Sequence, residues 1–191
     1  MQTVIPLEPG QYYHIYNRGV NRTNIFIEDR NYAHFMRLYA RYLTPVAETF
    51  AYCLLRNHFH LLVRIRDQAD RTKSISHAFN NWLNAYAKAI NKSYERTGSL
   101  FQHHFGRLPV TSDCNIVTLI HYIHYNPQKH GFVADFREWP YSSYHDLLSS
   151  QSTWLERSAV LDWFGGVEVL RQFLTPPADE PAILAYTGED D

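Results

Sequence analysis

Two histidines one residue apart, His58 and His60, lie in an apolar run that is typical of a buried β-strand. Successive side chains of a strand point to opposite faces, so the two imidazoles share one face while Phe59 and Leu61 point to the other. The apolar set would face the core and leave the histidines side by side. At this separation both imidazoles could hold one metal ion or one phosphate oxygen. Ordinary packing on a polar face is the alternative.

Tyr122 and Asn126 form a second candidate pair, because they are four residues apart in a helical pattern and therefore lie on one helix face. Isoleucines at 116, 120 and 123 form an adjacent apolar stripe for the core. The helix can thus present a phenol and an amide oxygen to the face that carries the histidines. Structural roles stay open for both residues, since the chain has 14 tyrosines and Asn126 precedes a helix-stopping Pro127.

The elements that must position these residues alternate between strands and helices. Strands are expected at 12–17, 50–55, 59–65, 99–102 and 107–111, and helices at 29–43, 74–94 and 113–125. Asp29 and Asp113 are the expected helix caps, and the last helix should end at Asn126-Pro127. This order predicts an α+β fold, with a ferredoxin-like antiparallel sheet, helices packed on one face, and a C-terminal extension.

The distribution of charge divides the chain. Residues 1–145 carry 16 Lys and Arg against 10 Asp and Glu, a net +6, whereas residues 146–191 carry 2 against 9, a net −7. All 11 histidines lie in the basic part. We expect residues 1–145 to form the functional domain and 146–191 an acidic extension, partly packed on the body and loose from Pro176 onward. A basic body favours a polyanionic partner, although the charges of both parts could simply be solvated.

The sequence argues against a membrane protein and against a secreted, disulfide-bonded protein. No apolar run approaches the roughly 18 residues that span a membrane, and the N-terminus lacks a secretory signal, so a cytoplasmic location is expected. Cys53 and Cys114 lie in apolar-patterned segments without a second cysteine at metal-binding spacing. We expect buried thiols there rather than a disulfide.

Four stretches, in this order, resemble the single-tyrosine (HUH) transposases of the IS200-like superfamily, and above all the REP-associated tyrosine transposases. They are His58–His60, Gly98–Gln102, His121–Gly131 and Trp139–Tyr144. The resemblance runs from about Tyr12 to Tyr144, which is most of the chain. The combination is specific, whereas the histidine pair alone would be weak.

The resemblance implies a DNA-transposition and recombination enzyme, an endonuclease and strand transferase that acts on single-stranded or hairpin DNA. Carried over position by position, it makes His58 and His60 metal ligands, Tyr122 the nucleophile and Asn126 the third ligand. Some branches of the family have glutamine at this last position. The implied cofactor is Mg²⁺ or Mn²⁺, and the implied products are a 5′-phosphotyrosine and a free 3′-hydroxyl.

This chemistry is reasonable on its own terms. A phosphodiester is anionic and repels nucleophiles, so a cation that neutralises a non-bridging oxygen lowers the barrier. A covalent phosphotyrosine stores the energy of the broken bond, so that rejoining needs no ATP. Mn²⁺ should bind more tightly than Mg²⁺, because imidazole suits it better.

Further residues near predicted loop and strand ends could bind DNA. The cations would contact phosphates, and the aromatic side chain would stack on a base. The predicted set is Arg18, Arg22, Arg56, Arg64, Phe101, Arg107 and Lys129. Tyr16 and Phe105 could also stack on bases, while His103 and His104 could line the groove; solvated charge or core packing is the alternative for each.

Two other functions compete with an active nuclease. One is a domesticated hairpin-binding protein that no longer cuts DNA, which the intact histidines, tyrosine and asparagine disfavour. The other is a two-histidine oxygenase, which needs a carboxylate ligand that the sequence does not offer near either pair. Monomer and homodimer both stay open, because related transposases can place the tyrosine in a partner's site. The acidic extension could compete with DNA or dock a second subunit.

Overall fold

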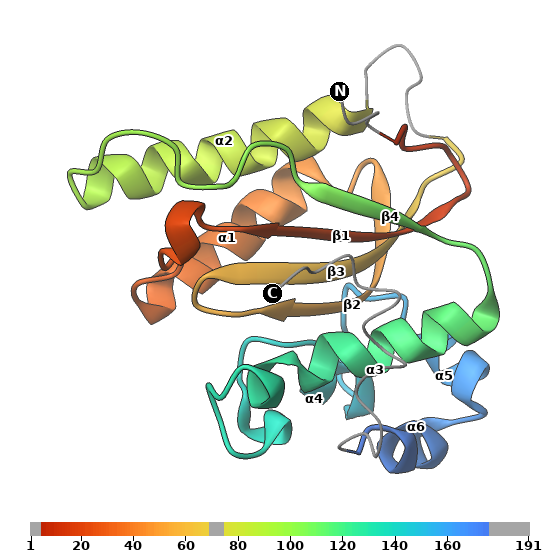
Figure 1. The fold of residues 1–191 in the computed structure, drawn as a ribbon. Coiled ribbons are helices and arrows are strands. Elements are labelled where there is room, and N and C mark those ends of the chain that lie inside the picture. Colours follow the sequence, from red (N-terminus) through yellow and green to blue (C-terminus); the bar gives the residue numbers. More distant parts are fainter. Residues whose placement is uncertain (1–4, 69–74, 176–191) are drawn as a thin grey trace.

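A computed structural model describes residues 5–68 and 75–175 of the chain. Its centre is a four-stranded sheet in the order β2-β3-β1-β4, in which every neighbouring pair is antiparallel (Figure 1). The strands are β1 (Tyr12–Arg18), β2 (Ala47–Leu54), β3 (His58–Ile65) and β4 (Gly106–Val110). With α1 (Asp29–Tyr42) between β1 and β2, and α2 (Ile75–Ser93) between β3 and β4, this is the expected ferredoxin-like α+β arrangement.

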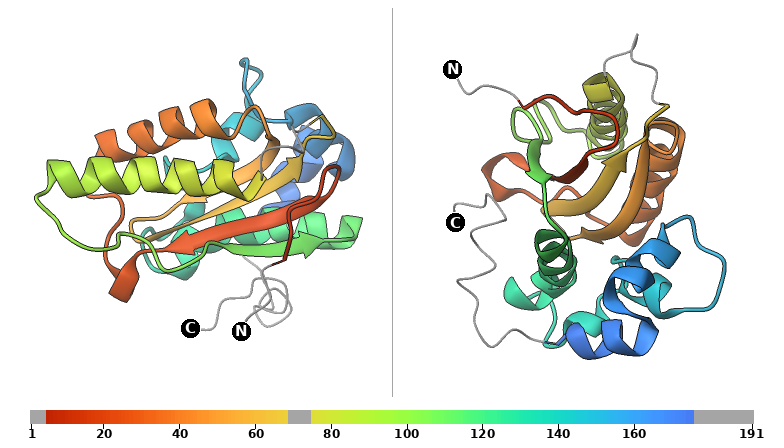
Figure 2. Two further views of the ribbon diagram at one scale, coloured as in Figure 1. Left: turned by 90° about the horizontal axis from the view of Figure 1, so that it is seen from above. Right: turned by 90° about the vertical axis from the view of Figure 1, so that its right-hand side faces the viewer.

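Helices cover both faces of the sheet. The helices α1 and α2 pack on one face, as expected, and α3 (Asp113–Lys129) lies against the other (Figure 2). The strand β3 is therefore buried on both sides. Phe59, Leu61 and Val63 belong to the core under α1 and α2, while Leu62 belongs to the core under α3. The histidines face this second layer, which is the helix that the sequence pattern placed against their face.

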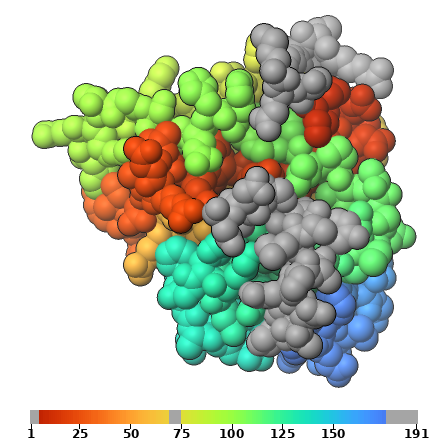
Figure 3. Space-filling model, in the orientation of Figure 1, coloured from red at the N-terminus to blue at the C-terminus, as the bar shows by residue number. Residues whose placement is uncertain are grey.

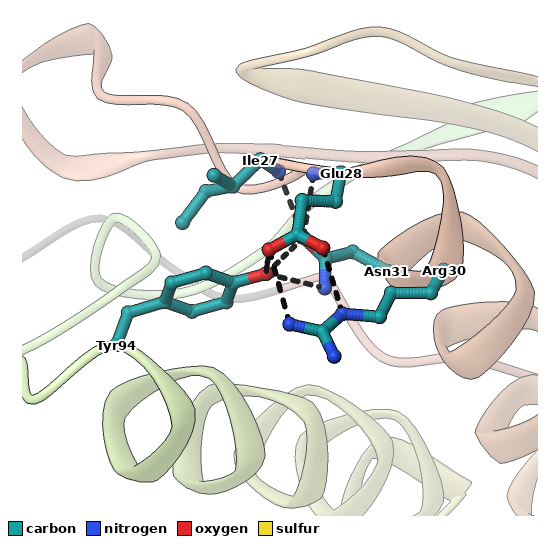
Figure 4. Close-up of polar contacts among 5 residues, drawn as sticks. All are labelled: Ile27, Glu28, Arg30, Asn31 and Tyr94. Atoms are coloured by element: carbon teal, nitrogen blue, oxygen red, sulfur yellow. Dashed lines mark hydrogen bonds and ion pairs between the residues drawn. The ribbon is translucent and has the colours of Figure 1, made fainter.

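The start of α1 is held by polar contacts with the end of α2 (Figure 4). Glu28, and not the expected Asp29, is the N-cap, and it forms a capping box with Asn31. The Asn31 side-chain oxygen accepts hydrogen bonds from the backbone N–H groups of Ile27 and Glu28, both at 2.9 Å. The Tyr94 hydroxyl donates to Glu28 at 2.7 Å. These bonds satisfy backbone donors that every helix start leaves without a partner inside the helix.

The end of α3 differs from the prediction. The helix runs through Pro127 to Lys129, and Ser112 rather than Asp113 is its N-cap. A proline inside a helix lacks its own N–H bond and crowds the carbonyl four residues before it. Here the helix nevertheless continues for one more half turn, and the His130 N–H closes it by donating to the Asn126 carbonyl at 3.0 Å. Lys129 is therefore the last residue of α3 and His130 is its C-cap, whereas the prediction placed both in a loop after the helix.

The residues that follow pack back on the body through α4 (Tyr144–Leu148), α5 (Arg157–Phe164) and α6 (Val167–Phe173). Figure 1 shows α5 and α6 next to α3, and in Figure 3 the blue C-terminal segment lies directly below the green part of the surface. Val160 and Leu170 are fully buried in the core that α3 shares with β2. The expected loose end from Pro176 onward lies outside the described residues.

Smaller details complete the fold. The strand expected at 99–102 is reduced to one bridge between Gly19 and Phe101. Cys53 is buried as expected, but Cys114 is exposed. No helix in the described part of the chain is long and apolar enough to cross a membrane.

Candidate active site

The site forms where three elements meet. The strand β1 pairs with β3 so that Tyr16 lies opposite His60 and Arg18 opposite His58. Because side chains alternate along β1, His14, Tyr16 and Arg18 share the face that carries the two histidines. The helix α3 crosses this face and sets the Tyr122 ring 5.4 Å from the His60 ring, nearly perpendicular to it.

His60 is held by a neighbour on the adjacent strand. Its Nδ1 lies 2.9 Å from His14 Nε2, and both side chains are fully buried. Burial holds the pKa of His60 well below its ordinary value, and the positive charges of His14, His130, Arg18 and Lys129 lower it further. The His60 imidazole is therefore neutral at neutral pH, which is the form that binds metals.

His58 is oriented by the residue before it. Its Nδ1 lies 2.7 Å from the Asn57 side-chain oxygen. An amide oxygen only accepts, so Nδ1 carries the proton and the lone pair of the neutral ring is on Nε2. The His58 and His60 rings are 5.1 Å apart and perpendicular. The His130 ring stands 4.8 Å from His58 on its other side.

Asn126 lies one turn after Tyr122 and is completely buried. Its side-chain nitrogen donates to the Tyr122 carbonyl at 2.9 Å. Its Oδ1 atom is buried and accepts no hydrogen bond within residues 5–68 and 75–175. A buried amide oxygen without a donor is costly, so this atom is a candidate ligand for a cation.

The last turn of α3 adds positive charge. The Lys129 ammonium lies 5.3 Å from the centre of the Tyr122 ring. Next to it, a cavity of about 300 Å³ is lined by Arg18, Arg22, Asn57, His58, His130 and Phe132. The Arg56 guanidinium stands 5.9 Å from the Phe132 ring at the same edge. Four predicted DNA-binding cations thus gather here: Arg18, Arg22, Arg56 and Lys129.

The structure does not bring three other predicted DNA-binding residues to this site. Arg64 lies six residues along β3 from His58, about 20 Å away at about 3.3 Å per residue, and pairs with Glu48 and Asp67 at 3.1 and 2.8 Å. Arg107 is buried on the α1 and α2 face, where it donates to the Ser76 hydroxyl at 2.7 Å. Both therefore lie away from this site with their charges already engaged by tertiary contacts, and a DNA contact by either one stays a prediction.

Phe101 is also placed differently from the prediction. It is only 8% exposed, and its ring packs against Phe59 and Tyr86 in the core. A ring this buried has no open face on which a base could stack. It lines a hollow of about 600 Å³ between α2 and residues 98–105 instead.

Sequence reasoning did not single out His14 and His130 as functional residues. A signal for each was present. His14 and Tyr16 alternate on one face of their strand, as the histidine pair does, and His130 continues the series Tyr122, Asn126, His130 at four-residue intervals. Only the pairing of β1 with β3, and the passage of α3 through Pro127, make these positions neighbours of the site.

The donor set limits which metals this site could bind. Among residues 5–68 and 75–175, no group of three or more His, Cys, Asp or Glu side chains could hold a metal ion. Within these residues, the two-histidine, one-carboxylate site of an oxygenase is therefore not formed. A third protein ligand beside His58 and His60 would then belong to another residue type, such as the amide oxygen of Asn126.

Comparison with known proteins agrees with the resemblance drawn from the sequence. No protein-family model matches the chain. A Haemophilus influenzae protein named "Putative REP-associated tyrosine transposase" is 33% identical over 104 residues, which is 51% of this chain and 59% of that protein. The alignment thus spans about three fifths of the relative's length.

A solved structure shares the fold. It is described as a REP-associated tyrosine transposase bound to a REP hairpin, and it superimposes with a TM-score of 0.63. The match covers 78% of this chain and 86% of that one at 17% sequence identity. The resemblance to REP-associated tyrosine transposases is therefore confirmed in sequence and in fold.

Proposed function

We propose that this chain, similar in sequence and fold to REP-associated tyrosine transposases, is a nuclease and strand transferase for single-stranded or hairpin DNA. One observation carries the proposal. The Tyr122 ring lies against His60, and the buried oxygen of Asn126 lies one helical turn away. A nucleophile and a cation-binding set thus share one enclosed site. A DNA substrate also favours the expected cytoplasmic location.

The residues present fit a divalent metal. His58 Nδ1 is bonded to Asn57 and His60 Nδ1 to His14, so in each ring Nε2 is the atom suited to a metal. With Asn126 Oδ1, this gives two neutral nitrogens and one oxygen, which suits Mn²⁺ or Mg²⁺. When bound, such an ion would neutralise a phosphate oxygen at the scissile bond.

Tyr122 would perform the covalent step. Its phenol oxygen forms a bond to phosphorus while the bond from phosphorus to the 3′ oxygen breaks. The phenol gives up its proton to water, and the departing 3′ oxygen takes one up as a hydroxyl. The DNA is left joined to Tyr122 through its 5′ phosphate. Lys129, beside the ring, stabilises the negative charge that develops on the phenol oxygen.

The cations around the cavity would bind the DNA backbone. Arg18 and Arg22 line it together with His58. Guanidinium groups bind phosphates in a bidentate manner, which positions the strand without reading its sequence. Tyr122 lies against the histidines of its own chain, and this supports a site that one chain completes.

The test is a denaturing-gel assay with labelled single-stranded hairpin DNA in Mn²⁺ or in EDTA. Wild type should form a covalent protein–DNA band in Mn²⁺ only, and Tyr122→Phe and His58→Ala should form none. Tyr125→Phe is a matched control, because Tyr125 lies on α3 but packs against His121 and Phe136. A band of equal strength with Tyr122→Phe would refute the assigned nucleophile.

One observation favours the alternative of a binder that does not cut. Tyr122 is only 1% exposed, so a phosphate reaches it only if neighbouring groups move. A protein that had lost cleavage would bind the hairpin without forming a covalent band. Clear DNA binding with no band in Mn²⁺, for wild type as for Tyr122→Phe, would establish this alternative.

A further inference from the structure

The stretch 139–144 carries part of the family resemblance, yet the proposed chemistry does not use it. It runs along the outer edge of β2 and is held there by backbone hydrogen bonds. The Leu54 N–H donates to the Tyr141 carbonyl at 2.8 Å, and the Ser143 N–H donates to the Tyr52 carbonyl at 2.9 Å. The segment therefore covers an edge that the sheet would otherwise leave open.

The side chains of this segment also fix the end of β2. The Trp139 ring is buried, and its indole N–H donates to the Leu54 carbonyl at 3.0 Å. The Tyr141 ring stacks on Tyr32 of α1, with the ring centres 3.5 Å apart and the planes at 4°. Leu54 is the last residue of β2, and the turn after it leads directly to His58. The segment thus anchors the strand end from which the histidine pair follows.

Ser143 joins the same segment to α3. Its hydroxyl oxygen lies 2.8 Å from His124 Nε2, and both residues are buried. The other ring nitrogen, Nδ1, lies 2.8 Å from the Ile120 carbonyl and therefore carries a proton. Burial lowers the pKa of His124 to about 4, so the ring is neutral at neutral pH and Nε2 is an acceptor. Ser143 therefore donates to His124, while its oxygen accepts the Tyr52 N–H at 2.9 Å.

His124 and Tyr122 lie on different sides of α3. With 3.6 residues per turn, two positions along a helix are about 200° apart around its axis. Tyr122 lies against His60 on the inner strand β3, whereas His124 reaches the outer edge of β2. The apolar contacts under α3 are not directional, but a hydrogen bond is. A rotation of α3 about its axis would therefore break the bond to Ser143.

We propose that residues 139–144 position the nucleophile, and that Ser143 and His124 are the positioning residues that hold Tyr122 against the histidine pair. This inference rests on the proposed function and deepens it, because it names the contact that aligns the two halves of that site. In the proposed chemistry neither residue touches the reacting atoms. Alignment matters for the rate, since a misplacement of about 1 Å can slow a reaction about 100-fold.

Four variants of the full chain separate alignment from general stability. His124→Leu removes the acceptor and leaves Ser143 bonded to Tyr52, whereas His124→Gln supplies an acceptor oxygen in its place. Ser143→Ala removes the donor. Ser142→Ala is the matched control, because Ser142 is also buried in this segment but accepts from the Tyr144 N–H, at 3.4 Å. Urea denaturation shows which variants are folded and how much stability each one loses.

The first readout is the rate of covalent band formation in Mn²⁺ at saturating labelled hairpin DNA. His124→Leu and Ser143→Ala should be slower by about 10- to 100-fold, with the dissociation constant for DNA unchanged. The double variant should be no slower than either single one, because both changes remove the same bond. His124→Gln should recover much of the rate, and Ser142→Ala should keep the rate of wild type.

The second readout needs neither metal nor cleavage. An NMR cross-peak between ring protons of Tyr122 and His60, whose ring centres are 5.4 Å apart, reports the alignment directly. It should be present in wild type, His124→Gln and Ser142→Ala, and lost in His124→Leu and Ser143→Ala.

A wild-type rate and cross-peak in His124→Leu would overturn the positioning role, whatever stability that variant loses. A rate for His124→Gln as low as that for His124→Leu would also overturn it. If wild type forms no covalent band, while the cross-peak is still lost in His124→Leu, the proposed function falls and the positioning role stands.

Discussion

His14 and His60 share a hydrogen bond across two neighbouring strands, and this bond sets the role of each ring. If His60 Nδ1 donates to His14 Nε2, the lone pair of His60 is on Nε2, the nitrogen that would bind a metal. Such outer partners hold a ligand ring in place and raise its basicity. His14 is therefore a positioning residue for the proposed metal site.

We predict that His14→Ala weakens Mn²⁺ binding by about 10- to 100-fold, because the His60 ring loses its orienting acceptor. His14→Gln should recover part of the affinity, since its amide oxygen can accept the same bond. Isothermal titration of DNA-free protein with Mn²⁺ measures this directly. His77→Ala, exposed on α2, serves as the control; the same dissociation constant for His14→Ala and wild type would contradict the assignment.

Gly106 determines where the Tyr16 ring lies. A Cβ atom at Gly106 would come within 2.2 Å of the Tyr16 ring, so only glycine permits the ring to lie across β4. Gly106→Ala should therefore destabilise the protein by about 1 to 3 kcal/mol through overpacking. Urea denaturation measures the change.

A double-mutant cycle separates this clash from other effects of the substitution. In a Tyr16→Ala background the clash is absent, so adding Gly106→Ala should cost little. An equal loss of unfolding free energy in both backgrounds would show that a clash with Tyr16 does not cause the destabilisation.

At the scale of elements, the end of α2 is fastened to the start of α1 through Asn31, Glu28 and Tyr94. This junction joins the two helices that cover one face of the sheet. Asn31 is 6% exposed, and its side-chain oxygen satisfies two backbone donors. Its contribution is that of a helix cap, although it lies inside the helix.

We predict that Asn31→Ala lowers the free energy of unfolding by about 2 kcal/mol, because two backbone N–H groups lose their acceptor. The change should appear as a lower urea midpoint with an unchanged slope. Arg30→Ala is the matched control: it removes only the ion pair of the 72% exposed Arg30 side chain with Glu28 and leaves both backbone N–H groups with their acceptor, so the midpoint should shift far less than in Asn31→Ala. Equal midpoints for Asn31→Ala and wild type would refute the capping role.

At the scale of the whole molecule, the proposed active site is assembled from β1, β3 and α3 of one chain. Tyr122 and His60 meet without a second copy. If this arrangement persists during cleavage, an equal mixture of Tyr122→Phe and His58→Ala should form no covalent DNA band. Restoration of the band in the mixture would show that the tyrosine enters the site of a partner chain.

The effect of the acidic C-terminal region on DNA binding can be tested by truncation, and the choice of end point matters. Deletion from Gln151 would remove Val160 and Leu170, which are buried in the core, so it would unfold the body rather than isolate the effect of charge. Truncation after Thr175 removes five carboxylates and no cation: Asp179, Glu180, Glu189, Asp190 and Asp191.

We predict that truncation after Thr175 strengthens DNA binding at low salt, and that the gain shrinks as salt screens the charges. Anisotropy titrations at two ionic strengths provide the measurement. The full-length chain with the five carboxylates changed to amides should behave like the truncated one. Unchanged affinity at low salt would exclude electrostatic competition by this region.

The sequence by itself determined the faces of the elements. Alternation along β3 placed His58 and His60 on one face and Phe59 and Leu61 on the other, and the four-residue spacing placed Asn126 one turn beyond Tyr122. The order of elements predicted the ferredoxin-like sheet. These features follow from backbone geometry within single elements, which a local pattern of residues encodes.

Only the tertiary structure decided which charges and rings surround the site. In the sequence, all four of these arginines are cations near the ends of predicted elements: Arg18, Arg22, Arg64 and Arg107. In the structure, Arg64 pairs with Glu48 and Arg107 donates to Ser76, whereas Arg18 and Arg22 line the cavity. His14 joined the site because β1 pairs with β3. Pairing between strands and packing of a helix across them depend on contacts between distant segments, whose free energy no local pattern records.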